Sequence, residues 1–191
     1  MQMSMKNKIA LFGTTAVASF GLGTAVAQAE PVKVTGGQTE LRLNKKAGAA
    51  LKDLGLTAEG TAYEVKKGEY DFAPIADGGG GVLDHRGSLT IAGDDAKVKL
   101  KNFQVDVFGD EGTQPDPKIQ GVLIAKVGGK ELEVANLSTK SYESSEEDYT
   151  FSGLTVKLTE DAAKALNEAF DTDAFEANLK IGKLSNESEV K

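Results

Sequence analysis

Hydrophobic residues recur at every second position over much of the chain, which is the spacing of β-strands that bury one face. The clearest example covers residues 122–127 and 130–134, two alternating segments separated by Gly128 and Gly129. Two central glycines allow the positive φ angles that a tight primed turn requires. These residues therefore predict an antiparallel β-hairpin.

A second hairpin is predicted between residues 88–92 and 97–108. In its second strand the apolar residues up to Leu100 share one phase, whereas those from Phe103 onward share the opposite phase. Because a one-residue slip moves a strand's side chains to the other face, the change needs a local correction. We predict a β-bulge close to Asn102 and Phe103, which would return the apolar residues to one side.

Two segments with helical spacing interrupt the strands, at residues 41–54 and 156–170. Each reads as a short strand, then a capping residue (Asn44 or Thr159), then an amphipathic helix. They either resemble each other by coincidence or belong to a pseudo-symmetric domain whose first and last strands each deliver a helix onto an end of the sheet. The predicted fold class is mainly β (all-β or α+β), an antiparallel β-sandwich-like domain with two short helices.

Residues 1–29 have the features of a secretory signal peptide rather than of a folded segment. Lys6 and Lys8 form a positive start, an uncharged stretch of apolar and small residues follows, and Ala27 and Ala29 complete a cleavage motif. A membrane anchor is the alternative, but polar and small residues dilute the stretch. We predict an exported protein, extracellular or associated with the cell envelope, without a transmembrane anchor in the mature chain. Residues 30–191 would form a single domain.

Composition narrows the chemistry. The chain has no Cys and a single His, and its formal net charge is −7. Thiol catalysis, disulfides and cysteine-ligated metals are therefore excluded, and an acidic protein is a poor partner for nucleic acids. No G-x-S-x-G motif or clear nucleophile with its base is present. We expect a protein that is not an enzyme, with no catalytic residues.

Three polar features have simple interpretations. The acidic residues 142–149 could attract calcium but are better read as a solvated loop, and residues 171–175 only begin like a calcium loop. We therefore predict no metal site. Asn136 and Asn186 each begin a sequence that fits the N-glycosylation pattern.

The lone histidine, His85, lies between Asp84 and Arg86 in a position that we expect to be partly exposed at a turn. It also begins a stretch, residues 85–91, that together with the closing residues 153–163 resembles the HtaA-type domain of actinobacterial cell-envelope haem-uptake proteins. The resemblance covers most of residues 38–184. It implies a β-rich, sandwich-like fold with short helices.

In haem-binding members of that family a tyrosine near the N-terminus ligates the iron, and the motif histidine supports it. His85 matches the supporting histidine, but residues 37–43 replace the family's aromatic N-terminal segment, so no position matches the ligating tyrosine. Tyr63 and Tyr70 precede His85 and could supply a phenolate, although each could equally be an ordinary strand residue. We expect a secreted or cell-envelope binding or structural module with an unknown partner and no cofactor, with haem binding or haem relay as the alternative.

Overall fold

The computed structural model describes residues 31–70, 80–109, 119–139 and 150–191. The predicted signal peptide and the acidic residues 142–149 lie outside these ranges. Within them, no helix is long and apolar enough to cross a membrane. The elements, in chain order, are β1 (Val32–Leu43), α1 (Lys45–Asp53), β2 (Thr57–Glu59), β3 (Ala62–Val65), β4 (Gly68–Tyr70), β5 (Gly80–Arg86), β6 (Ser88–Ala92), β7 (Lys97–Gly109), β8 (Ile119–Val127), β9 (Lys130–Ser138), β10 (Phe151–Leu158), α2 (Glu160–Phe170) and β11 (Lys180–Val190).

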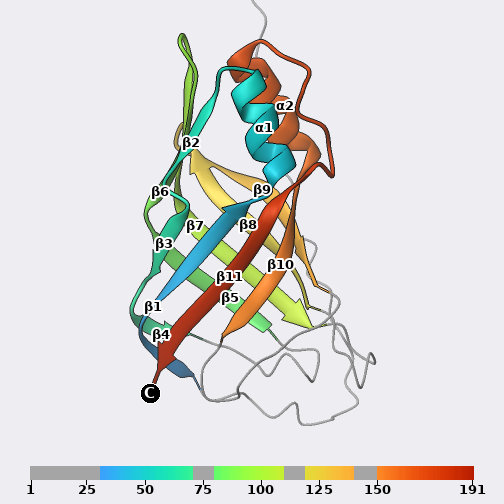
Figure 1. Cartoon of the computed structure of the whole chain (residues 1–191). Coiled ribbons are helices and arrows are strands. Elements are labelled where there is room, and N and C mark those ends of the chain that lie inside the picture. Colours follow the sequence, from blue (N-terminus) through green and yellow to red (C-terminus); the bar gives the residue numbers. More distant parts are fainter. Residues whose placement is uncertain (1–30, 71–79, 110–118, 140–149) are drawn as a thin grey trace, which may run out of the picture.

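The strands of the described residues form one antiparallel sheet in the order β2-β6-β7-β5-β3-β1-β11-β10-β9-β8, with β4 beside β1. A further pairing between β7 and β8 closes this sheet on itself, so it surrounds a core as a barrel does (Figure 1). The predicted class, mainly β and antiparallel with two helices, is confirmed. Strands on opposite sides of the barrel pack against each other across one core, as the two sheets of a β-sandwich do, but here they belong to one closed sheet.

The predicted β-bulge in β7 is confirmed. Asn102 has a φ of 51°, and the register between β7 and β8 shifts between Lys101 and Gln104. The bulge lies where β7 changes partners, because its first half pairs with β6 and its second half with β5. Leu100 and Phe103 are consequently both buried, although they are three positions apart, an odd spacing that would place them on opposite faces of a regular strand.

The two predicted hairpins are also confirmed. Strands β8 and β9 meet at a turn in which Gly128 and Gly129 have φ angles of 58° and 88°. Both angles lie in the left-handed region, as a type I′ turn requires. In the second hairpin, Ser88 to Ala92 of β6 pair with Lys101 to Lys97 of β7, and residues 93–96 form the connecting loop.

Helices α1 and α2 both lie at one end of the barrel (Figure 1), where side chains of both line one cavity. Each begins at a predicted cap: the Asn44 side chain accepts from the Ala47 amide at 2.8 Å, and Thr159 accepts from Ala162 at 3.1 Å. Strands β1 and β10 both pair antiparallel with β11, so they run in the same direction and deliver their helices to the same end. The pseudo-symmetric alternative placed the second helix after the last strand of the domain, but β11 comes after α2.

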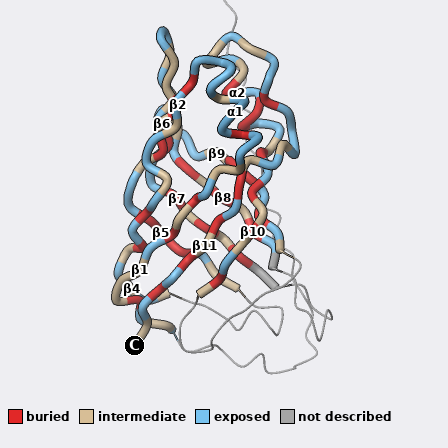
Figure 2. The backbone as a smooth tube through the Cα atoms, in the orientation of Figure 1, coloured by how far each residue is buried: buried red, intermediate tan, exposed pale blue. Residues whose placement is uncertain are grey.

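Strand β11 closes the barrel between β1 and β10. Its Gly182 lies directly against β1, where a Cβ atom would collide with the carbonyl of Arg42. A side chain at this position would push the two strands apart. Burial alternates along the strands around the barrel, with the buried positions facing the core (Figure 2).

Candidate functional site

His85 lies on β5 inside the barrel, and its exposed fraction is 0%. The expectation of a partly exposed turn residue is wrong. His85 pairs with Val65 of β3, and Tyr63 lies two residues before Val65, so the side chains of His85 and Tyr63 face the same interior. The charged neighbours of His85 alternate with it and therefore point to the other side of the strand.

A directed chain of hydrogen bonds fixes His85. The Thr39 hydroxyl donates to Oδ1 of Asn186 at 2.7 Å, and Asn186 Nδ2 donates to the Ser188 hydroxyl at 2.9 Å. The Nε2 atom of His85 lies 2.6 Å from the same Thr39 oxygen. Because the single hydroxyl proton of Thr39 is already donated to Asn186, Nε2 must carry a proton and donate it to Thr39. The network thus assigns the Nε2–H tautomer to the neutral ring.

This tautomer leaves Nδ1 of His85 as an acceptor, and Nδ1 has no hydrogen-bond partner among the residues that the structure describes. Burial lowers the pKa of His85 to about 4, and the nearby carbonyl groups of Leu83 and Phe103 only partly oppose that effect. The imidazole is therefore neutral at pH 7. In this position the ring is a structural donor inside the core.

Tyr63 is also buried, with 1% of its surface exposed. Its ring lies 4.3 Å from the ring of Phe103, centroid to centroid, and within the described part of the chain its hydroxyl has no hydrogen-bond partner. Burial raises the pKa of this phenol well above its usual range, which opposes formation of a phenolate.

Tyr70 lies elsewhere. It is half-buried on β4, and its hydroxyl donates to the Lys66 carbonyl at 2.8 Å. Burial is the main cause that raises the pKa of the Tyr70 phenol, and the negative charge of the neighbouring Asp84 raises it further. Asp84 adjoins His85 on β5 and so faces away from the interior that His85 enters. The structure therefore brings Tyr63, and not Tyr70, to the same side as His85.

The interior is layered along the barrel. Thr39 is the register partner of both Tyr63 and Asn186, so these three residues lie at one level. We call the cluster of Thr39, His85, Asn186 and Ser188 the polar layer. Two residues further along each strand, the pair Leu41 and Leu184 forms an apolar level between the polar layer and the helices.

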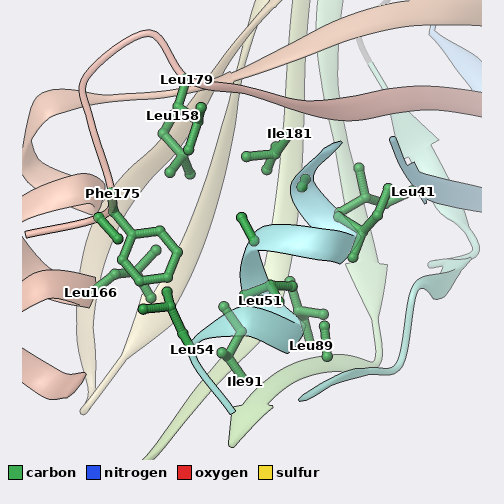
Figure 3. A pocket seen from close by; sticks show the side chains of 15 residues that line it. Leu41, Leu51, Leu54, Leu89, Ile91, Leu158, Leu166, Phe175, Leu179 and Ile181 are labelled. Atoms are coloured by element: carbon green, nitrogen blue, oxygen red, sulfur yellow. The ribbon is translucent and has the colours of Figure 1, made fainter. Parts of the chain in front are cut away.

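Beyond that level lie two small apolar cavities beneath the helices, with volumes of about 70 and 140 Å³. Side chains from both helices and from several strands converge on the smaller one (Figure 3). The two cavities share five wall residues: Leu89, Ile91, Leu158, Leu166 and Ile181. They are therefore adjoining spaces in one apolar region.

Haem fits this interior poorly. Sites for cofactors and other ligands of that size typically have volumes of about 300 to 1,000 Å³, well above the 70 and 140 Å³ of these cavities. Neither cavity is lined by a His, Tyr, Cys or Met that could ligate an iron. His85 and Tyr63 lie in neither wall, and Nε2 of His85 is already bonded to Thr39.

Three members of the polar layer, Thr39, Asn186 and Ser188, were not predicted as site residues. Asn186 begins a sequence that fits the N-glycosylation pattern, but its side chain is fully buried in the folded protein, with an exposed fraction of 0%. Asn136, on β9, is exposed. A strand whose inward residues are polar shows no hydrophobic alternation, which hid β11 from the sequence.

The fold and its interior define a small antiparallel barrel module, with a buried polar layer at one level and a helix-covered apolar region at another. No family model and no curated protein matches the chain. A solved structure that resembles it is the C-terminal domain of HtaA from Corynebacterium glutamicum, with 13% sequence identity, a TM-score of 0.52, and 84% of this chain and 99% of that chain covered. The fold is therefore HtaA-like.

A second solved structure, a domain-swapped dimer of a histidine-to-alanine variant of that same domain, aligns with a TM-score of 0.40 and 14% identity. It covers 88% of this chain and 99% of its own.

Proposed function

We propose that the protein is an exported, non-enzymatic module of HtaA-like fold, which binds a partner or contributes to surface structure without a resident cofactor. The observation that carries the proposal is the polar layer. The one histidine of the chain is neutral, buried and hydrogen-bonded to Thr39, so it is not presented to a substrate. A general acid or base must reach the proton that it transfers, and His85 in this position does not.

Export rests on the features of residues 1–29. Expression of the full chain in a secreting bacterial host tests it by intact-mass analysis of the protein in the medium. We expect a mature chain that begins at Glu30. A protein that stays with the cells and retains Met1 would contradict export.

Haem binding is the alternative, favoured by the resemblance to HtaA-type domains and by the shared interior of His85 and Tyr63. It would require the core to open, because both residues are almost fully buried. A titration of residues 30–191 with haemin, followed by absorbance, separates the two functions. On the proposed function we expect no saturable Soret shift.

The same titration with Tyr63→Phe and with Tyr70→Phe provides a matched pair, because only Tyr63 shares the interior of His85. A one-to-one shift that is weakened by Tyr63→Phe and by His85→Ala, but not by Tyr70→Phe, would establish the haem function instead. Circular dichroism of each variant must show the wild-type fold before its titration is compared.

A further inference from the structure

The apolar region beneath the helices differs from the polar layer because it is incompletely filled and its walls are almost entirely apolar. Its two adjoining cavities are enclosed almost wholly by leucine, isoleucine, valine and alanine side chains, with Phe175 as an aromatic wall residue of the smaller one. The larger cavity, of about 140 Å³, is close in size to an engineered apolar cavity of about 150 Å³ that stays dry and binds benzene or xenon. Space of this kind favours an apolar occupant over water.

We propose that the two cavities together form a binding site for a neutral, unbranched aliphatic chain. The inference names a ligand class for the binding role proposed above, and so it rests on that proposal. The five shared wall residues are all Leu or Ile, whose side chains can change rotamer to join the two spaces.

The shape of the region selects this class of ligand. Two small spaces separated by branched side chains suit a narrow, flexible chain that bends between them, and they do not suit a rigid fused-ring system that is too large for either space alone. The walls also contribute almost no polar surface that could pair with a buried hydrogen-bonding group. A polar or charged ligand would lose its hydration there without compensation.

Helix α1 is the side on which such a chain would enter. Ala47 is its only buried residue, Leu51 is half-buried, and Leu54 at its end is 36% exposed. The start of the helix is held, because Asn44 caps it and also donates to the Lys180 carbonyl of β11 at 2.7 Å. A helix fixed at its start and lightly packed beyond it can move away from the cavity with little loss of buried surface.

The experiment is a titration of residues 30–191 with straight-chain alcohols from hexan-1-ol to dodecan-1-ol, followed by methyl NMR and by calorimetry. We expect saturable binding that tightens about fourfold per added methylene, until the cavities are filled and the gain stops. The methyl signals of Leu166 and Ile181 should shift. That of Val82, an exposed apolar residue on β5, should not.

Variants that fill the cavities test the location. Ala165→Leu on α2 and Ala50→Leu on α1 each add a side chain to a wall, of the larger and the smaller cavity respectively. Each should weaken decan-1-ol binding at least tenfold. Ala49→Leu is the matched control, because Ala49 is exposed on α1 and lines neither cavity; it should bind as the wild type does.

If no alcohol in the series binds saturably to the wild-type protein, the cavities are packing voids only. This result would overturn the proposal, whatever the variants do. Equal binding by Ala165→Leu, Ala50→Leu and Ala49→Leu would overturn the location. Shifts of the Leu166 and Ile181 methyl signals on addition of dihexanoylphosphatidylcholine below its critical micelle concentration would identify a lipid as the source of the chain, and unchanged signals would identify a free chain. Failure of the proposed function would appear as a saturable Soret shift with haemin, whereas failure of this inference would appear as the absence of saturable alcohol binding, so the two failures are distinguishable.

Discussion

The same strands build two contrasting levels of the barrel. On β1, Thr39 enters the polar layer, whereas Leu41, two residues later, lines the smaller cavity. On β11, Asn186 belongs to the polar layer, and Ile181, five residues earlier, lines both cavities. On β1, therefore, only about 7 Å along the strand separates a hydrogen-bonded cluster from an apolar space that is incompletely filled.

The contrast shows how one barrel can be rigid in its polar layer and adaptable in the apolar region beneath its helices. In the polar layer the hydrogen bonds restrain the rotamers of neighbouring residues and select the tautomer of His85, so a change in one member is transmitted to the others. In the apolar region no directional bond selects a rotamer, and Leu or Ile side chains can repack around an occupant. Substitutions in the two levels should consequently have different costs.

The largest expected effect is that of His85→Ala. It removes a large buried side chain and leaves Thr39 without its donor, so we expect a loss of about 3 to 5 kcal/mol in the free energy of unfolding. Ile181→Val, on the cavity side, should cost about 1 kcal/mol. Urea denaturation measures both. Equal losses would remove the energetic contrast between the levels.

Acid should destabilise the polar layer next most strongly. The pKa of His85 is lowered to about 4 in the folded protein, whereas a histidine in an unfolded chain has a pKa of about 6.5. Between these values the unfolded state binds a proton that the folded state does not, so stability is complete above about pH 6.5 and falls as the pH approaches 4. The expected loss over this window is about 3 kcal/mol.

Urea denaturation at several pH values, for the wild type and for His85→Asn, isolates this contribution, because carboxylates titrate alike in both. The difference between their stabilities should shrink toward pH 4. A difference that is constant with pH would show that His85 is protonated alike in the folded and unfolded states.

Thr39→Val tests the direction of the hydrogen bonds with little change in volume. It leaves Nε2–H of His85 without an acceptor and removes the donor to Asn186 Oδ1, so we expect a loss of about 2 kcal/mol. Tyr63→Phe is the matched comparison, because its buried hydroxyl has no partner to lose. That change should be neutral or slightly stabilising in thermal denaturation. A larger loss for Tyr63→Phe would place Tyr63 within the network.

The two hairpin turns, the β-bulge and the helix caps were predictable because the sequence features that specify them are local. The glycine pair at 128 and 129, the change of phase at Asn102, and the caps Asn44 and Thr159 each act within a few residues, and the structure confirms each of them. The mainly β class followed from these elements. Closure of the sheet did not, because the pairing of β7 with β8 is a tertiary choice that periodicity does not encode.

The candidate site was predicted less well, for a physical reason. His85 has charged neighbours that point outward, so the sequence around it resembles an exposed turn although its side chain is buried. Its partners come from residues 39, 186 and 188, and polar residues that face inward break the hydrophobic pattern on which strand prediction depends. Strand β11 contributes residues to both the polar layer and the cavities, so neither can be located without knowing that β11 lies between β1 and β10.

The smallest expected effect concerns α1, the lightly packed cover of the apolar region. A Cβ atom at Gly48 would meet nothing within 4 Å, and this glycine lies inside the helix. Gly48→Ala should therefore stabilise the protein by about 0.5 to 1 kcal/mol through helix propensity alone. Gly128 also has open space but a φ of 58°, so Gly128→Ala should destabilise the protein.

If α1 is the entry side, Gly48→Ala should also slow decan-1-ol exchange measured by NMR, while Gly128→Ala leaves the exchange rate unchanged. Equal exchange rates in both variants would place the entry elsewhere.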